Sequence, residues 1–120
     1  MADKNRDIKK RSYNFAIRVI QLVDIIAKNG LSSEVIAKQL IRSATSIGAN
    51  IIEAQAGSSK KDFINFLNHA LKSANETVFW LSVIIDSDKS SGQDVISLKK
   101  EAIELANILG SSIITLRRSK

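Results

Sequence analysis

Apolar residues recur every three or four positions in four long segments of the chain, at about 8–28, 33–56, 60–86 and 92–118. In the first segment Phe15, Val19, Leu22 and Ile26 fall on one stripe, and polar residues fill the opposite side. A β-strand would scatter this spacing over both of its faces, whereas an α-helix keeps it on one. The pattern therefore predicts four amphipathic helices.

Short clusters of helix-breaking residues separate these segments, at 29–30, 57–59 and 86–92. Ser59 and Asp62 fit a capping box, so the third helix should begin at Lys60. Short connections between helices of similar length make sequence neighbours antiparallel. We therefore expect an all-α fold, an antiparallel up-down-up-down four-helix bundle, that forms a single domain over residues 1–120.

Composition narrows the class of protein further. The chain is 44% hydrophobic and 25% charged, which is typical of a folded globular domain, and it contains no proline. It also contains no cysteine, which excludes a disulfide framework and a thiolate metal site. The charged N-terminus lacks the apolar core of a signal peptide, and no uncharged run is long enough to span a bilayer. We therefore expect a cytoplasmic protein that has no membrane partner.

The charge balance favours a polyanionic partner. Lys and Arg outnumber Asp and Glu by 18 to 12, and the isoelectric point lies near 9.8. In an up-down bundle the start of the first helix, the turn between the second and third helices and the end of the fourth helix meet at one end. The basic residues of these three segments should form one basic pole that binds nucleic acid: Lys4, Arg6, Lys9, Lys10, Arg11, Lys60, Lys61, Arg117, Arg118 and Lys120. The alternative is that these terminal charges are solvated and serve only solubility.

A second apolar line runs along the second and third helices, beside a polar one. Small and apolar residues beyond the main stripes would suit contacts between subunits, and the polar residues would suit hydrogen bonds between helices. The residues predicted to make subunit or structural contacts are Arg42, Ser46, Ala49, Asn50, Ile52, Glu53, Ala56, Phe66, Glu76, Trp80 and Ile84. Stacking of Phe66, Phe79 and Trp80 on bases is an alternative for the aromatic residues.

The sequence carries no pattern typical of an enzyme. His69 is the only histidine, so a di-metal centre built from Glu-x-x-His pairs is excluded, and we expect His69 at the surface or an interface. Neither a glycine-rich phosphate loop nor a serine with a histidine partner is present. Glu53 and Glu76 could be read as an acid and base pair, but a polar line beside an apolar one favours hydrogen bonds between helices. We expect no enzymatic activity, no cofactor and no metal.

Three stretches of the second and third helices carry a family resemblance: QLIRSATSIGANIIEA at 39–54, GSSKKDF at 57–63 and ALKSANETVFWL at 70–81. They resemble the bacterial four-helix-bundle family called the S23 ribosomal protein or 23S rRNA intervening-sequence protein family. The resemblance implies an up-and-down bundle that assembles into a ring, typically a homopentamer, and it implies no catalytic residues. It also implies kinship with the accessory protein of diversity-generating retroelements, which associates with a reverse transcriptase and nucleic acid.

Two functions follow from these observations. The first is a non-enzymatic, oligomeric module that binds RNA or DNA without sequence preference through the basic pole, with assembly multiplying a weak site. The second is a homo-oligomeric structural or adaptor protein whose partner is another protein. The expected partners are therefore copies of the chain itself, RNA or DNA, or a second protein.

Overall fold

Four α-helices of similar length form the described part of the chain. The structure is a computed structural model that describes residues 3–87, 89–90 and 92–119, with side chains from Ile8 onward. The helices are α1 (Asp3–Ile26), α2 (Leu31–Gln55), α3 (Lys60–Asp86) and α4 (Gln93–Arg118), and a short 3₁₀ helix, η1 (Ala27–Asn29), follows α1. The predicted bounds of the third helix are confirmed, whereas the first helix begins five residues earlier than expected.

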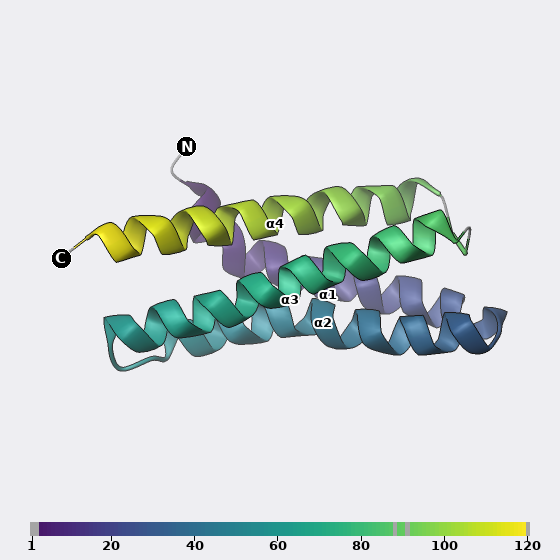
Figure 1. Cartoon of the computed structure of the whole chain (residues 1–120), viewed down its shortest axis with the longest axis horizontal. Helices are drawn as coiled ribbons and strands as arrows, with labels where there is room; N and C mark the ends of the chain where they lie inside the picture. The colour runs from purple at the N-terminus through teal and green to yellow at the C-terminus, as the bar shows by residue number, and fades with distance from the viewer. Residues whose placement is uncertain (1–2, 88, 91, 120) are drawn as a thin grey trace.

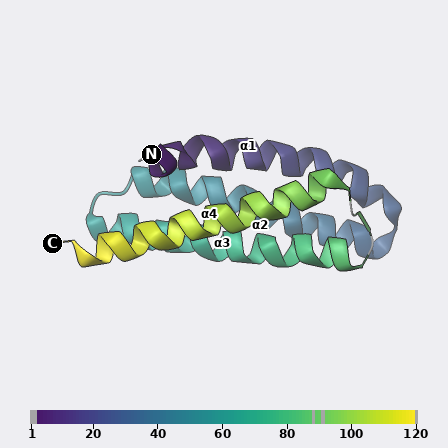
Figure 2. The same ribbon diagram turned by 90° about the horizontal axis from the view of Figure 1, so that it is seen from above.

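The helices lie side by side and alternate in direction, as the ribbon in Figure 1 shows. Each helix packs against its sequence neighbours, and α4 also packs against α1, so the four form a closed ring in which α1 lies diagonally across from α3. The view from above in Figure 2 shows the same order. Helices of 24 to 27 residues are about 36 to 40 Å long, which fits the 50 × 26 × 20 Å extents of the molecule. The predicted all-α bundle is confirmed.

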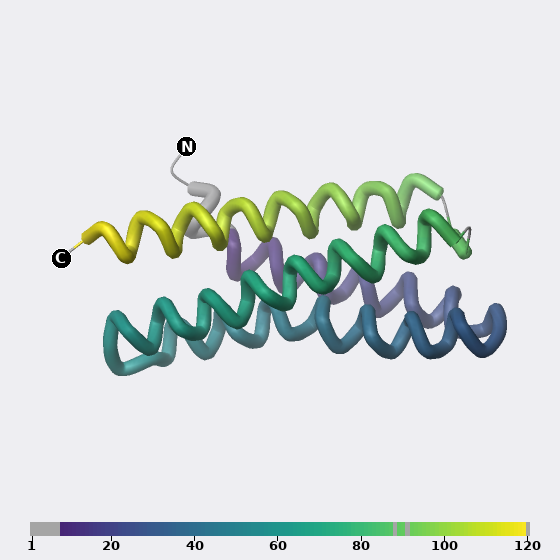
Figure 3. Tube along the Cα trace, viewed as in Figure 1, coloured from purple at the N-terminus to yellow at the C-terminus, as the bar shows by residue number. Residues whose placement is uncertain are grey.

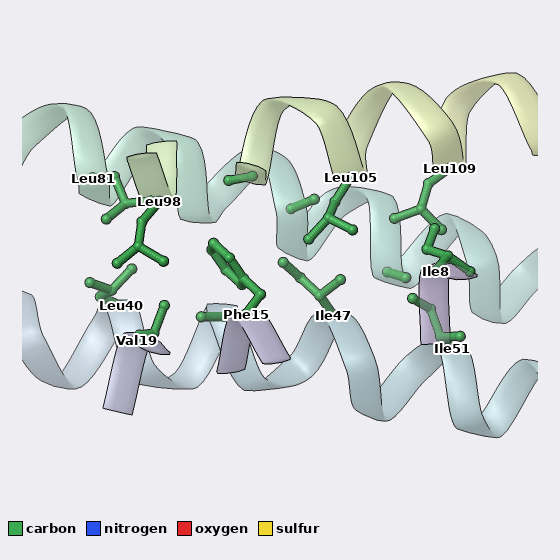
Figure 4. Close-up of a cluster of buried hydrophobic side chains, with 14 of the residues drawn as sticks. Ile8, Phe15, Val19, Leu40, Ile47, Ile51, Leu81, Leu98, Leu105 and Leu109 are labelled. Carbon is green, nitrogen blue, oxygen red and sulfur yellow. The ribbon is translucent and has the colours of Figure 1, made fainter. Parts of the chain in front are cut away.

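The core lies along the bundle axis and receives one stripe from every helix. Phe15 of α1, Leu40 and Ile47 of α2, Leu81 of α3 and Leu105 of α4 are almost completely buried there, and Figure 4 shows several of them facing one another. Burying a side chain of this size stabilises the fold by about 1.5–3 kcal/mol. The stripe predicted for the first helix is confirmed, since all four of its residues are buried.

The second apolar line predicted for the third helix needs a correction. Ile84 was expected on a flanking line that could serve as an anchor for another subunit, but its side chain is fully buried in the core of its own bundle. Thr77 lies seven residues before Ile84, on the same side of α3, and is also buried; its hydroxyl lies 2.9 Å from the Ser43 hydroxyl of α2. Because α3 packs against both α2 and α4, its buried arc is wide enough to include the flanking line.

Two turns hold the helices in register. Gly30 joins η1 to α2 with a φ of 126°, a conformation that only glycine adopts without strain. At the start of α3 the Ser59 hydroxyl accepts a hydrogen bond of 3.1 Å from the Asp62 amide, as the capping box predicted. This second turn positions the basic residues that begin α3.

Candidate nucleic-acid interface

A basic hollow lies between the first turns of α3 and the last turn of α4, and we call it the α3–α4 hollow. Its volume is about 630 Å³, and its lining consists of Lys60, Lys61, Asp62, Ile64, Asn65, Asn68 and Arg117. Figure 1 shows why these segments meet, because the α2–α3 turn and the C-terminal end of α4 lie at the same end of the bundle. The prediction that the turn between α2 and α3 meets the end of α4 is confirmed.

Lys60 ties the two walls of the hollow together. Its ammonium group donates to the Ser119 carbonyl oxygen at 2.5 Å and lies 2.8 Å from the Ser119 hydroxyl. Carbonyl oxygens at the end of a helix lack partners within that helix and carry partial negative charge, so a lysine is favoured there. Lys60 therefore fixes the end of α4 against the start of α3.

The remaining charge of the hollow is positive. Lys61 and Arg117 are exposed, and no described carboxylate forms an ion pair with either of them. Asp62 opposes them, but its carboxylate accepts a hydrogen bond from Ser58 at 3.2 Å and its backbone amide belongs to the helix cap. Arg118 is exposed in the same last turn of α4, although it does not line the hollow.

Asn65 and Asn68 add amide groups that the sequence did not assign to binding. Each amide side chain offers two donors and an acceptor, so both can complement a phosphate, a sugar or a base edge. They follow Lys61 at intervals of four and seven residues, which places all three on one side of α3. That spacing was the available signal for finding them.

Lys9 and Lys10 do not join this hollow, which corrects the prediction of one basic pole. They border a different groove, between α1 and α2, together with Thr45 and Ile52. The α1–α2 side and the α3–α4 side are opposite sides of the helix ring. In addition, the trace in Figure 3 shows α1 running beside α2. Alternating helix direction fixes the end of a bundle at which a segment lies, but not the side that the lysines of α1 take.

Arg11 is bound within the chain instead of being free for a polyanion. Its guanidinium forms two hydrogen bonds with Glu101 of α4, at 3.0 and 2.7 Å, and a third with Glu104 at 2.6 Å. The hydrogen bonds to Glu101, more than those to Glu104, raise the pKa of Arg11 above its ordinary value. The two glutamates lie three residues apart on α4, so both can face Arg11 from the same side of that helix.

Three residues predicted for the basic pole fall outside the side chains that the structure describes. Lys4 and Arg6 belong to the first turns of α1, where only the backbone is described, and Lys120 follows the described residues. Their predicted role in nucleic-acid binding stays a prediction.

A polar seam joins α2 to α3. Arg42 pairs with Glu76 across the two helices, and Glu76 also accepts a hydrogen bond of 3.1 Å from the Trp80 indole nitrogen. Trp80 and Phe66 are partly buried against the core, and Phe66 lies 6.2 Å from the His69 ring between ring centres. The structural contacts predicted for Arg42, Glu76 and Trp80 are present within one chain.

The other polar residues predicted on α2 form hydrogen bonds within that helix or lie exposed. Ser46 donates to the Arg42 carbonyl oxygen at 2.7 Å, and Asn50 donates to the Ser46 carbonyl oxygen at 2.9 Å, so both bonds stay within the helix. Glu53 is exposed, and so is His69 on α3, as expected for a surface histidine. Glu53 and Glu76 therefore do not share a cleft of the kind that an acid and base pair would need.

The predicted contact residues that remain on the surface are Ala49, Ile52 and Ala56 of α2. Ala49 and Ile52 line the groove that Lys9 and Lys10 border, which we call the α1–α2 groove. Tyr13 of α1 lines it as well and is 66% exposed, although no pattern in the sequence singles it out. Apolar side chains therefore remain exposed on this side of the described bundle.

None of the described helices is long and apolar enough to cross a membrane. Among the described side chains, no group of three or more His, Cys, Asp or Glu residues is arranged to hold a metal ion.

Comparison with known proteins agrees with the sequence resemblance. The sequence profile of the 23S rRNA-intervening sequence proteins matches residues 4–111. A solved structure from Bacteroides thetaiotaomicron, described as a protein of unknown function from the S23 ribosomal protein family, is similar to this fold with a TM-score of 0.81 and 39% identity, over 88% of this chain and 97% of that chain. No curated protein matches the chain. Since the profile covers most of the sequence, the chain belongs to the 23S rRNA-intervening sequence protein family.

Proposed function

We propose that this protein is a non-enzymatic nucleic-acid-binding module and that the α3–α4 hollow holds the phosphate backbone. The observation that carries the proposal is the meeting of Lys60, Lys61 and Arg117 from two separate helices around one hollow. Cations clustered on a surface displace the counterions condensed on a nucleic acid, which gives affinity without sequence preference. The net charge of +6 adds long-range attraction.

The lining of the hollow favours backbone contacts over base stacking. Apart from Asp62, its described members are basic, amide or aliphatic, and none of them is aromatic. Proteins that bind single strands through their bases stack those bases on exposed aromatic rings. Lysine, arginine and asparagine instead bind phosphate and sugar oxygens. The proposal therefore covers RNA and DNA alike.

Assembly into a homo-oligomer is part of the same proposal, because copies of one weak site bind a long polyanion by avidity. Support comes from apolar residues left exposed on α3 and α4, namely Phe79 at 56%, Ile103 at 41% and Ile114 at 53%. A ring of five copies is the form that the sequence resemblance implies. Size exclusion coupled to light scattering tests it, and a monomer at micromolar concentration would remove the avidity argument.

Titration of a fluorescently labelled RNA tests the binding site. The variant Lys60→Gln/Lys61→Gln/Arg117→Gln removes three charges from the hollow and should weaken binding about 10-fold or more at low salt, since each lost phosphate contact removes a share of the counterion release. The matched control Lys28→Gln/Lys72→Gln/Lys100→Gln removes three exposed charges elsewhere. It should retain most of the affinity.

Equal losses in the two variants would mean that net charge, and not the hollow, determines binding. Running the same titration with DNA of the same sequence shows whether the sugar contributes. A circular dichroism melt of each variant confirms that the bundle is intact.

An adaptor whose partner is another protein is the second candidate function. The observation that favours it is the α1–α2 groove, whose apolar lining is not covered by any part of the chain that the structure describes. Failure of the intact protein to bind RNA or DNA even at low salt would leave this function as the better explanation.

A further inference from the structure

The α1–α2 groove has the form of a socket for large apolar side chains. Its volume is about 480 Å³, and it is lined on α1 by Tyr13 and Ala16 and on α2 by Gly48, Ala49 and Ile52. Tyr13 is 66% exposed and Ile52 is 46% exposed. The small residues between these two large ones leave room for another side chain.

Close packing of α1 on α2 creates this shallow region. A Cβ atom at Gly48 would lie 3.3 Å from the Ser12 hydroxyl oxygen, so the absence of a side chain at Gly48 lets the two helices approach. The Ser12 hydroxyl is buried and donates to the Lys9 carbonyl oxygen at 3.0 Å. The Ser12 hydroxyl therefore has its partner inside α1, and the rest of the groove lining is mostly apolar.

The border of the groove is positively charged. Lys9 and Lys10 line one end of it, both are exposed, and no Asp or Glu is among the lining residues that the structure describes. An apolar occupant that carried carboxylates beside its apolar face would gain both burial and charge pairing there. Two lysines also disfavour a two-fold pairing of this groove with the same groove of a second copy, since four lysines would then meet. In a ring the groove would instead meet a different face of the next copy, which the light-scattering experiment below tests.

We propose that the α1–α2 groove binds an acidic amphipathic helix of another protein. Large apolar residues of that helix, spaced three or four apart, enter between Tyr13 and Ile52, and its Glu or Asp residues face Lys9 and Lys10. An apolar groove between two helices is a common receptor for such a helix. This interaction uses the side of the bundle opposite the α3–α4 hollow, so it is independent of nucleic-acid binding.

The test uses two designed helical peptides of about 18 residues that share one leucine face. One carries glutamate on its flanks and the other carries lysine. Fluorescence anisotropy with the full chain should show at least 10-fold tighter binding of the acidic peptide. The variant Lys9→Glu/Lys10→Glu should reverse that preference, whereas the control Lys72→Glu/Lys100→Glu, which alters exposed residues outside the groove, should keep it.

A steric variant tests the socket itself. Ala49→Gln fills the space between Tyr13 and Ile52 and should weaken binding of the acidic peptide at least 10-fold, while Ser111→Gln on the exposed face of α4 should have no effect. The proposal that the groove binds a helix is overturned if neither peptide binds the intact chain, or if Ala49→Gln leaves the affinity for the acidic peptide unchanged.

Two further outcomes would assign the groove to another occupant and reject the proposal. One is conversion of an oligomer to monomers by Ala49→Gln in light scattering, which would make the groove a contact between copies. The other is loss of RNA binding in Tyr13→Ala as large as that in the variant of the hollow, which would make Tyr13 a base-stacking residue. The proposal expects Ala49→Gln and Tyr13→Ala to leave both the oligomeric state and the RNA affinity unchanged.

Discussion

At the scale of single residues, Arg11 links α1 to α4 by binding two carboxylates. Its guanidinium is held by Glu101 and Glu104 at distances of 2.6 to 3.0 Å, and its side chain is 23% exposed. Charge-assisted bonds of this kind are stronger than neutral ones, and bidentate geometry also fixes the orientation of the two helices. Few other tertiary contacts between α1 and α4 can compensate, because most of the packing of α1 is against α2.

We expect Arg11→Gln to lower the free energy of unfolding by about 1–3 kcal/mol, since it leaves the partly buried Glu101 without its cation. A urea titration followed by circular dichroism measures the change, and Arg118→Gln, an exposed arginine of the last turn, is the control. A raised arginine pKa stabilises the fold while Arg11 is protonated, and that stability is lost only as the pH rises through the raised pKa. The loss of free energy of unfolding caused by Arg11→Gln should therefore be the same at about pH 6 and about pH 9. A loss that vanished at either pH would contradict this account.

The helices themselves follow from local patterns of residues. The spacing of Phe15, Val19, Leu22 and Ile26 fixed the buried stripe of α1, and the Ser59 to Asp62 spacing fixed the start of α3. These features depend on residues within one or two turns of each other, which a sequence displays directly.

What the sequence could not determine depends on which neighbour covers each side of a helix. Periodicity showed that α3 has a second apolar line, but not that the core of the bundle would bury Ile84 of that line. It placed Arg11 near the end of the bundle, but not opposite two glutamates about ninety residues later in the chain. The separation of Lys9 and Lys10 from the α3–α4 hollow has the same origin, because the side of a bundle that a residue takes is a tertiary property.

The cap of α3 is the element on which the hollow depends. Ser59→Ala removes the side-chain acceptor of the Asp62 amide and should destabilise the protein by about 1 kcal/mol. Thermal or urea unfolding checks the value. Ser58→Ala removes only an exposed hydrogen bond to the Asp62 carboxylate, so its effect should stay within about 0.5 kcal/mol. Equal effects of the two substitutions would contradict the capping role of Ser59.

The whole molecule presents two different surfaces on opposite sides of the helix ring. The α3–α4 hollow is basic and rich in amides, whereas the α1–α2 groove is apolar with a lysine border. The fold allows this division because each pair of neighbouring antiparallel helices exposes its own seam. The two proposals together predict that the protein binds a polyanion and a protein helix at the same time.

The dependence of RNA affinity on salt tests the central claim most directly. The logarithm of the binding constant should fall linearly with the logarithm of the salt concentration, with a slope of about −0.7 for each phosphate contact on a single strand and about −0.9 on a duplex. Replacing Lys60, Lys61 and Arg117 by Gln should make the slope shallower by about 2 to 3, whereas replacing Lys28, Lys72 and Lys100 should change it little. If both variants kept the slope of the intact protein, the α3–α4 hollow would not be the site at which nucleic acid binds.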